Sequence, residues 1–154
     1  MSLAYIDSGL FLAESIAEGE FNPSEHRNLV PLFLIHQGLE LLFKAALKLK
    51  QGKYPKSHDL EILKKEFDKE YPELVFEIPD CVSNEAIHNF ELFPELGPNK
   101  EILHEKFRYP TDRKGNFWKT MEDFDINYAL ESLKKLNRIS LEVWIKLNEP
   151  TKIA

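Results

Sequence analysis

Cysteine and glycine are scarce in this chain of 154 residues, and basic residues are fewer than acidic ones. A single cysteine, Cys81, excludes an intramolecular disulfide and any cysteine-rich zinc module. Lys and Arg number 20 against 26 Asp and Glu, so the formal net charge is −6. Because general binding to nucleic-acid backbones needs a basic surface, this balance excludes a protein that wraps long duplexes. It remains compatible with a local basic cleft on an acidic body.

Long apolar runs are also lacking. No stretch approaches the roughly 20 apolar residues of a membrane span, and the first residues lack the charged start and cleavage site of a secretory signal. Hydrophobic residues make up 43% and charged residues 30%, which is typical of a globular protein and too apolar for a disordered one. We therefore expect one soluble, cytoplasmic domain over residues 1–154, without membrane association.

The apolar residues recur with helical spacing, and segments of period two are nearly absent. We expect long helices over residues 2–18, from about 28 to 50, from 57 or 58 to 71, and from about 120 to 148. Two short helices should lie between 83 and 107. Pro31 falls in a first turn if the second helix is capped by Asn28, but would kink a helix that begins at Ser24. The expected fold class is an all-α antiparallel helical bundle with short accessory helices.

The apolar stripes of these helices predict the core. The second helix has the broadest stripe, which predicts a central helix contacted from several sides or one that also forms a subunit interface. The stripes comprise Leu3, Ile6, Leu10, Ala13 and Ala17, then Leu32, Ile35, Leu39, Leu42, Phe43, Ala46 and Leu49, then Leu60, Leu63 and Phe67, and finally Ile126, Ala129, Leu133, Leu136, Val143 and Leu147.

Glu40 is a carboxylate among the apolar residues of the second helix, so we expect it to be partly buried. A buried carboxylate needs a partner, and Lys44, one turn later, is the nearest candidate. A structural ion pair is the first interpretation of these two residues, and a role in a functional site is the second.

Two Glu-x-x-His patterns suggest an alternative function, a metal-dependent helical-bundle enzyme, since such pairs bind metal in di-iron bundles. Prolines between the two patterns place them on short helices instead of long facing ones, which argues against this alternative. We assign no metal-ligating residue and expect no cofactor. The patterns are Glu85-x-x-His88 and Glu101-x-x-His104, with Glu14 and Glu40 as the further ligands that such a site would need.

The most concentrated cationic patch near an aromatic residue follows the fifth expected helix. His104 and Arg108 share a face if that helix persists, and Tyr109 then turns the chain out of it. A histidine and an arginine at a helix end can hold phosphate or nucleotide oxygens. The alternative is an arginine paired with a neighbouring acid such as Asp112.

Three segments, in this order, resemble the HEPN family (higher eukaryotes and prokaryotes nucleotide-binding domain). Residues 37–47 resemble the family's Glu-x-x-x-Lys-Ala helix, through Glu40 and Lys44. Residues 57–63 resemble its His-Asp-Leu-x-x-Leu segment, which begins at His58. Residues 107–112 resemble its Arg-Tyr-Pro-Asp stretch before the last helix. The resemblance spans roughly residues 3–147.

This resemblance implies an antiparallel bundle that forms a homodimer with a cleft between the protomers. Many HEPN members are RNases that use an Arg followed after four to six residues by His. No arginine here has a His at that spacing downstream, so we assign no catalytic residue. The resemblance then implies a non-catalytic module that binds a nucleotide, an RNA end or a nucleotidyltransferase-like partner, as in a toxin–antitoxin system. A purely structural interaction subunit is a further alternative. The ligand-binding residues carried over are Glu40, Lys44, His58, His104, Arg108, Tyr109 and Asp112.

Overall fold

The computed structural model describes residues 1–20, 29–82 and 126–149 of the chain. These residues form four α-helices and two single-turn 3-10 helices, and they contain no strand. The expected all-α fold class is therefore confirmed. The α-helices are α1 (Ser2–Ala17), α2 (Leu29–Gln51), α3 (Leu60–Glu70) and α6 (Ile126–Asn148), and the 3-10 helices are η1 (Pro72–Leu74) and η2 (Asp80–Val82).

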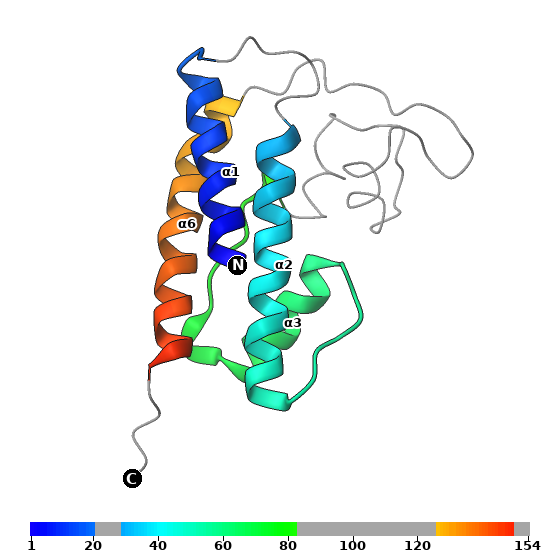
Figure 1. Ribbon diagram of the computed structural model, residues 1–154. Helices are drawn as coiled ribbons and strands as arrows, with labels where there is room; N and C mark the ends of the chain where they lie inside the picture. The colour runs from blue at the N-terminus through cyan, green and yellow to red at the C-terminus, as the bar shows by residue number, and fades with distance from the viewer. Residues whose placement is uncertain (21–28, 83–125, 150–154) are drawn as a thin grey trace, which may run out of the picture.

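The long helices lie side by side, and α1 packs against both α2 and α6 (Figure 1). α1 runs antiparallel to its two neighbours, and α3 packs across the C-terminal half of α2. α2 also contacts α6 and η2, so it is the central helix that its broad apolar stripe predicts. Pro31 lies in the first turn of α2, where its missing N–H group costs no helical hydrogen bond.

Two glycines allow α1 and α2 to approach closely. A Cβ atom at Gly9 would lie 2.8 Å from the Pro31 carbonyl oxygen, and one at Gly38 would lie 2.9 Å from the Ser2 carbonyl oxygen. Real Cβ atoms essentially never approach other heavy atoms so closely. Each glycine therefore faces the backbone of the other helix, and together they fix how α1 and α2 cross.

The core consists mainly of the expected apolar stripes, together with Ile16, Leu47, Leu74, Phe76 and Val82. Of the predicted residues, Leu3, Leu10, Ala17 and Leu147 are half-buried, and one is clearly exposed. Leu49 was expected to be buried but is 67% exposed. The reason lies in the pairing of α1 and α2, because Ser2, the first residue of α1, lies against Gly38. Leu49 is therefore roughly 16 Å further along α2, at 1.5 Å per residue, than the point where α1 begins. The predicted residues that are buried are Ile6, Ala13, Leu32, Ile35, Leu39, Leu42, Phe43, Ala46, Leu60, Leu63, Phe67, Ile126, Ala129, Leu133, Leu136 and Val143.

The third helix begins slightly later than expected. Asp59 is the N-cap, and its carboxylate accepts hydrogen bonds from the backbone N–H groups of Glu61 and Ile62 at 2.9 and 3.4 Å. Ser57 precedes the cap, with its Oγ accepting from the Asp59 N–H at 3.0 Å. The expected short helices between 83 and 107, and the expected start of the last helix near residue 120, lie outside the described residues.

From Val30 to Gln51, α2 is long and apolar enough to cross a membrane by length and composition, contrary to the expectation from the sequence. Most of this segment is buried against the rest of the bundle, and the core helix of a soluble protein has the same properties. The length and composition of α2 therefore fit its central position in the bundle.

Candidate functional site

The buried carboxylate of Glu40 binds two basic side chains. Its Oε1 atom accepts a hydrogen bond from Lys44 Nζ at 2.8 Å, and His58 Nδ1 lies 3.0 Å from the same oxygen. Since a carboxylate only accepts, this contact places a proton on Nδ1 of His58. Glu40 itself is 3% exposed. The expectation of a partly buried Glu40 paired with Lys44 is thus confirmed, with more complete burial than expected.

The two basic partners keep Glu40 ionised. Burial of the carboxylate acts to raise its pKa, but the hydrogen bonds and charges of Lys44 and His58 outweigh that effect and lower the pKa below 4.5. The second oxygen, Oε2, is also buried and accepts no hydrogen bond from any residue within the described ranges. Glu40 is therefore a charged acceptor with one oxygen shared by two donors and capacity left on the other.

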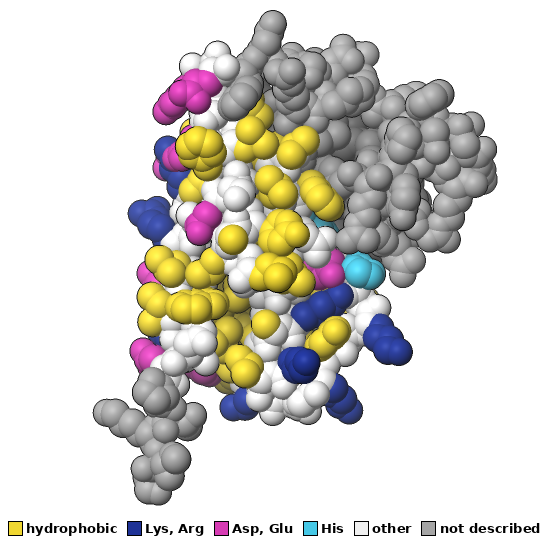
Figure 2. All heavy atoms as spheres, in the orientation of Figure 1, with side chains coloured by type: hydrophobic (Ala, Val, Ile, Leu, Met, Phe, Trp, Pro, Cys, Tyr) yellow, Lys and Arg dark blue, Asp and Glu magenta, His cyan; other side chains and the backbone are white. Residues whose placement is uncertain are grey.

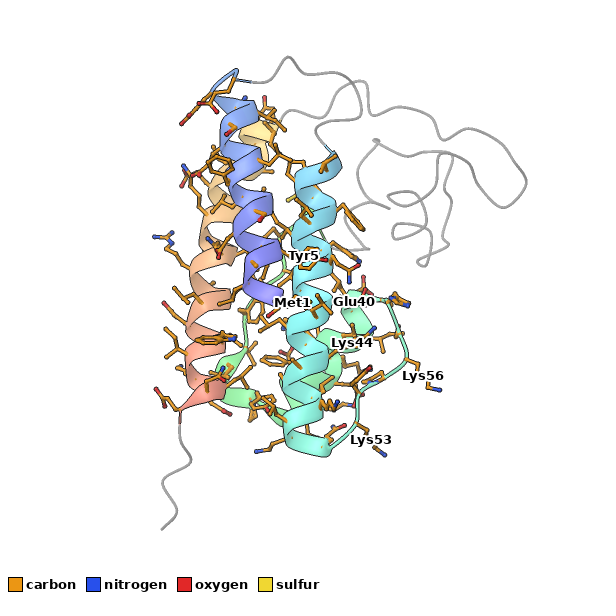
Figure 3. All side chains as sticks on the ribbon, in the orientation of Figure 1. Met1, Tyr5, Glu40, Lys44, Lys53 and Lys56 are labelled. Atoms are coloured by element: carbon orange, nitrogen blue, oxygen red, sulfur yellow. The ribbon has the colours of Figure 1, made fainter. Side chains whose placement is uncertain are left out.

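The two basic residues reach Glu40 from different elements. Lys44 comes from the next turn of α2, while His58 comes from the loop between α2 and α3 (residues 52–59), 18 residues away in the sequence. Lys44 is mostly buried, with 14% of its side chain exposed, whereas His58 has 44% exposed. Figure 3 shows Glu40 and Lys44 pointing from α2 towards the side on which this loop lies. The Glu40 carboxylate thus links α2 to the loop.

In the segment that resembles His-Asp-Leu-x-x-Leu, the histidine, the aspartate and the two leucines have different structural roles. His58 contacts Glu40, and Asp59 caps α3. Leu60 and Leu63 are fully buried in the core. Burial and capping alone account for Asp59 and the leucines, so His58 is the residue of this segment that belongs to the candidate site.

Lys44 also contacts an aromatic residue of the same loop. Its Nζ atom lies 5.8 Å from the centroid of the Tyr54 ring, within the range of a cation–π interaction. Tyr54 is 45% exposed. Glu40, Lys44 and Tyr54 therefore form a continuous row from the buried carboxylate to the surface.

Lysines gather around this row, and sequence reasoning did not identify them as a site. Between Glu40 and Asp59 the chain contains five lysines and no acidic residue, in a protein whose net charge is −6. In Figure 2 basic side chains surround the C-terminal end of α2 and the loop that follows it. Lys48 and Lys50 lie in the last turn of α2, where cations suit the negative end of the helix dipole, and Lys53 follows the helix. In the sequence, the signal for this wider basic surface is the absence of acidic residues between Glu40 and Asp59.

The remaining ligand-binding residues expected from the sequence are His104, Arg108, Tyr109 and Asp112. All four lie outside the described residues, so the described part of the site consists of Glu40, Lys44 and His58.

The two Glu-x-x-His patterns of the metal-dependent alternative also lie outside the described residues. Of the two further ligands that they would need, Glu40 is bonded to Lys44 and His58, and Glu14 lies 3.6 Å from Lys134 Nζ. Within the described ranges no three His, Cys, Asp or Glu residues are grouped so that they could hold a metal ion.

No protein-family model, curated protein or solved structure matches this chain.

Proposed function

We propose that this protein is a HEPN-like, non-catalytic module that binds a nucleotide or RNA and acts as a homodimer. The observation that carries the proposal is the contact of one buried carboxylate, Glu40, with both Lys44 and His58. Two of the three segments that resemble the HEPN family thus meet at this carboxylate.

In this proposal Glu40 holds Lys44 and His58 in place as donors to an anionic ligand. Arg108 binds phosphate oxygens, and Tyr109 stacks on the ligand or walls the pocket. The free capacity of Glu40 Oε2 suits a guanidinium, so Glu40 also orients Arg108. His104 and Asp112 complete the set around Arg108.

The homodimer is supported by the exposed apolar side chains on α1 and α2. Met1 just before α1, Phe11 on α1, and Val30 and Leu49 on α2 are 92%, 68%, 45% and 67% exposed. In Figure 2 apolar side chains form a broad band over these two helices. Exposed apolar patches of this kind are typical of protein interfaces. A second copy that covers the band would bring two Glu40 clusters into one assembly.

The experiment is a binding titration with a fluorescent ATP analogue and a short labelled RNA, using the wild type and Arg108→Ala. We expect binding without RNA cleavage, and a loss of about tenfold or more in the variant, since hydrogen bonds to charged groups contribute about 1.5–3 kcal/mol. Absence of binding to both probes, or an unchanged affinity in Arg108→Ala, would contradict the proposal. Light scattering that shows a monomer would contradict its dimeric part.

A further inference from the structure

The loop between α2 and α3 presents an aromatic ring between two lysines. Tyr54 is 45% exposed, and Lys53 and Lys56, on either side of it in the sequence, are both exposed. Figure 3 shows Lys53 and Lys56 projecting from this connection, on the same side of the bundle as Lys44. The loop therefore combines positive charge with an accessible π-face.

The charge of these lysines is not neutralised by the described part of the chain. Lys53 and Lys56 form no ion pair with any described residue, whereas Lys64, Lys69 and Lys134 each pair with an acid. The first acidic residue after these lysines in the sequence is Asp59, whose carboxylate caps α3. The first acidic residue before them is Glu40, which is buried and contacts Lys44 and His58. The loop is therefore a basic surface on an acidic protein.

We propose that single-stranded nucleic acid binds along this loop, with Lys53 and Lys56 pairing with phosphates and a base stacking on Tyr54. Aromatic rings next to cations are how proteins bind single strands without reading their sequence, because every base has a π-face. The inference rests on the proposed function and specifies its ligand, a strand instead of a free mononucleotide. Lys44, held by Glu40 and lying over Tyr54, fixes the ring.

A lipid surface is the other anionic partner that such lysines could contact. Residues 52–59 contain no Leu, Ile, Val or Met, and Pro55 is their one aliphatic residue, so the loop offers a bilayer little apolar area to bury. The ring of Tyr54 suits a base better, since stacking uses the aromatic face itself. The chemistry of the loop therefore favours a nucleic-acid strand.

The test measures anisotropy of a fluorescein-labelled oligouridylate of about ten nucleotides, a length within the usual site size, at several salt concentrations. Lys53→Ala/Lys56→Ala should lower the slope of log K against log salt by about 1.4, since two phosphate contacts are lost. Lys135→Ala/Lys146→Ala, which removes the same charge from exposed positions on α6, should leave the slope unchanged. Tyr54→Ala should weaken binding by about fivefold to 150-fold, while Tyr54→Phe should keep the wild-type affinity.

Equal slopes in the two double variants, or an unchanged affinity in Tyr54→Ala, would overturn the inference. If those results came with a loss of affinity in Arg108→Ala, the proposed function would stand and the loop would have no part in it. Binding of the wild type to phosphatidylserine vesicles but not to the oligouridylate would also overturn the inference. If the wild type bound the fluorescent ATP analogue but not the oligouridylate, the inference would fail and the proposed function would stand. Binding to neither probe would remove both.

Discussion

Lys44 Nζ lies 2.8 Å from Oε1 of Glu40, one turn earlier on the central helix, and both side chains are largely buried. A buried ion pair is costly to form because both charges lose water, and it is costly to break from one side because the remaining charge stays buried. His58 adds a third group to this pair. Such a cluster should have a measurable effect on stability and, if it serves binding, a separate effect on affinity.

Replacing the charge of Glu40 should destabilise the fold at neutral pH. We expect Glu40→Gln to lower the free energy of unfolding by about 1–3 kcal/mol, since Lys44 keeps its charge in a mostly buried position. The matched control is Glu66→Gln, which also removes a contact to a lysine but from an exposed pair. Urea titration should show a change within about 0.5 kcal/mol for this control. Equal effects of the two substitutions would contradict the account.

The effect of Glu40→Gln should depend on pH in a defined direction. The pKa of Glu40 is lowered in the folded protein, so the unfolded chain binds a proton at this site more readily. The stability that the carboxylate contributes is complete well above pH 4.5 and is lost as the pH falls through its lowered pKa. The difference in unfolding free energy between wild type and Glu40→Gln should therefore shrink on acidification. A difference that stayed constant between neutral pH and about pH 3 would show that charge is not its cause.

The crossing of α1 and α2 should not tolerate side chains at its two glycines. Gly9→Ala and Gly38→Ala should each lower the unfolding free energy by about 1–3 kcal/mol, because the new Cβ atom would meet backbone of the other helix. Alanine normally stabilises a helix relative to glycine by about 1 kcal/mol, so overpacking must exceed this gain. Ser8→Ala, at an exposed position of α1, is the control and should be neutral or slightly stabilising. Thermal unfolding that shows a gain for Gly38→Ala would contradict the close crossing.

Ser140 offers the opposite case, a side chain whose removal should help. It is fully buried on α6, and its Oγ finds no hydrogen-bond partner in the part of the chain that the structure describes. Ser140→Ala should raise the unfolding free energy by up to about 1 kcal/mol, because an unpaired buried hydroxyl is unfavourable. The control is Ser132→Ala, on the exposed face of the same helix, which should be stabilised only by the higher helix propensity of alanine. A Ser140→Ala protein less stable than Ser132→Ala would show that the hydroxyl has a partner.

Helical periodicity predicted much of the described fold, because the three-residue and four-residue spacings of Leu60, Leu63 and Phe67 or of Leu133 and Leu136 report directly which face is buried. Periodicity could not reveal where a neighbouring helix begins. Leu49 continues the stripe of α2 but lies beyond the start of α1, and is exposed for that reason.

The candidate site was predictable only where its residues are close in the sequence. Glu40 and Lys44 are four residues apart on one helix, so their contact follows from helix geometry. The contact with His58 depends on how the loop folds back on α2, and no local spacing encodes it. The same is true of Lys44 lying over Tyr54.

The affinity of Glu40→Gln for single-stranded RNA tests the central claim most directly, measured where circular dichroism shows the variant to be folded. The substitution removes a negative charge. If Glu40 were only an acidic neighbour of the site, it would repel the RNA, and its loss would strengthen binding. If Glu40 instead positions Lys44 and His58, its loss should weaken binding. We predict a loss of affinity of about fivefold or more, equivalent to about one hydrogen bond. Unchanged or tighter binding would contradict the account and leave Glu40 and Lys44 as a structural ion pair.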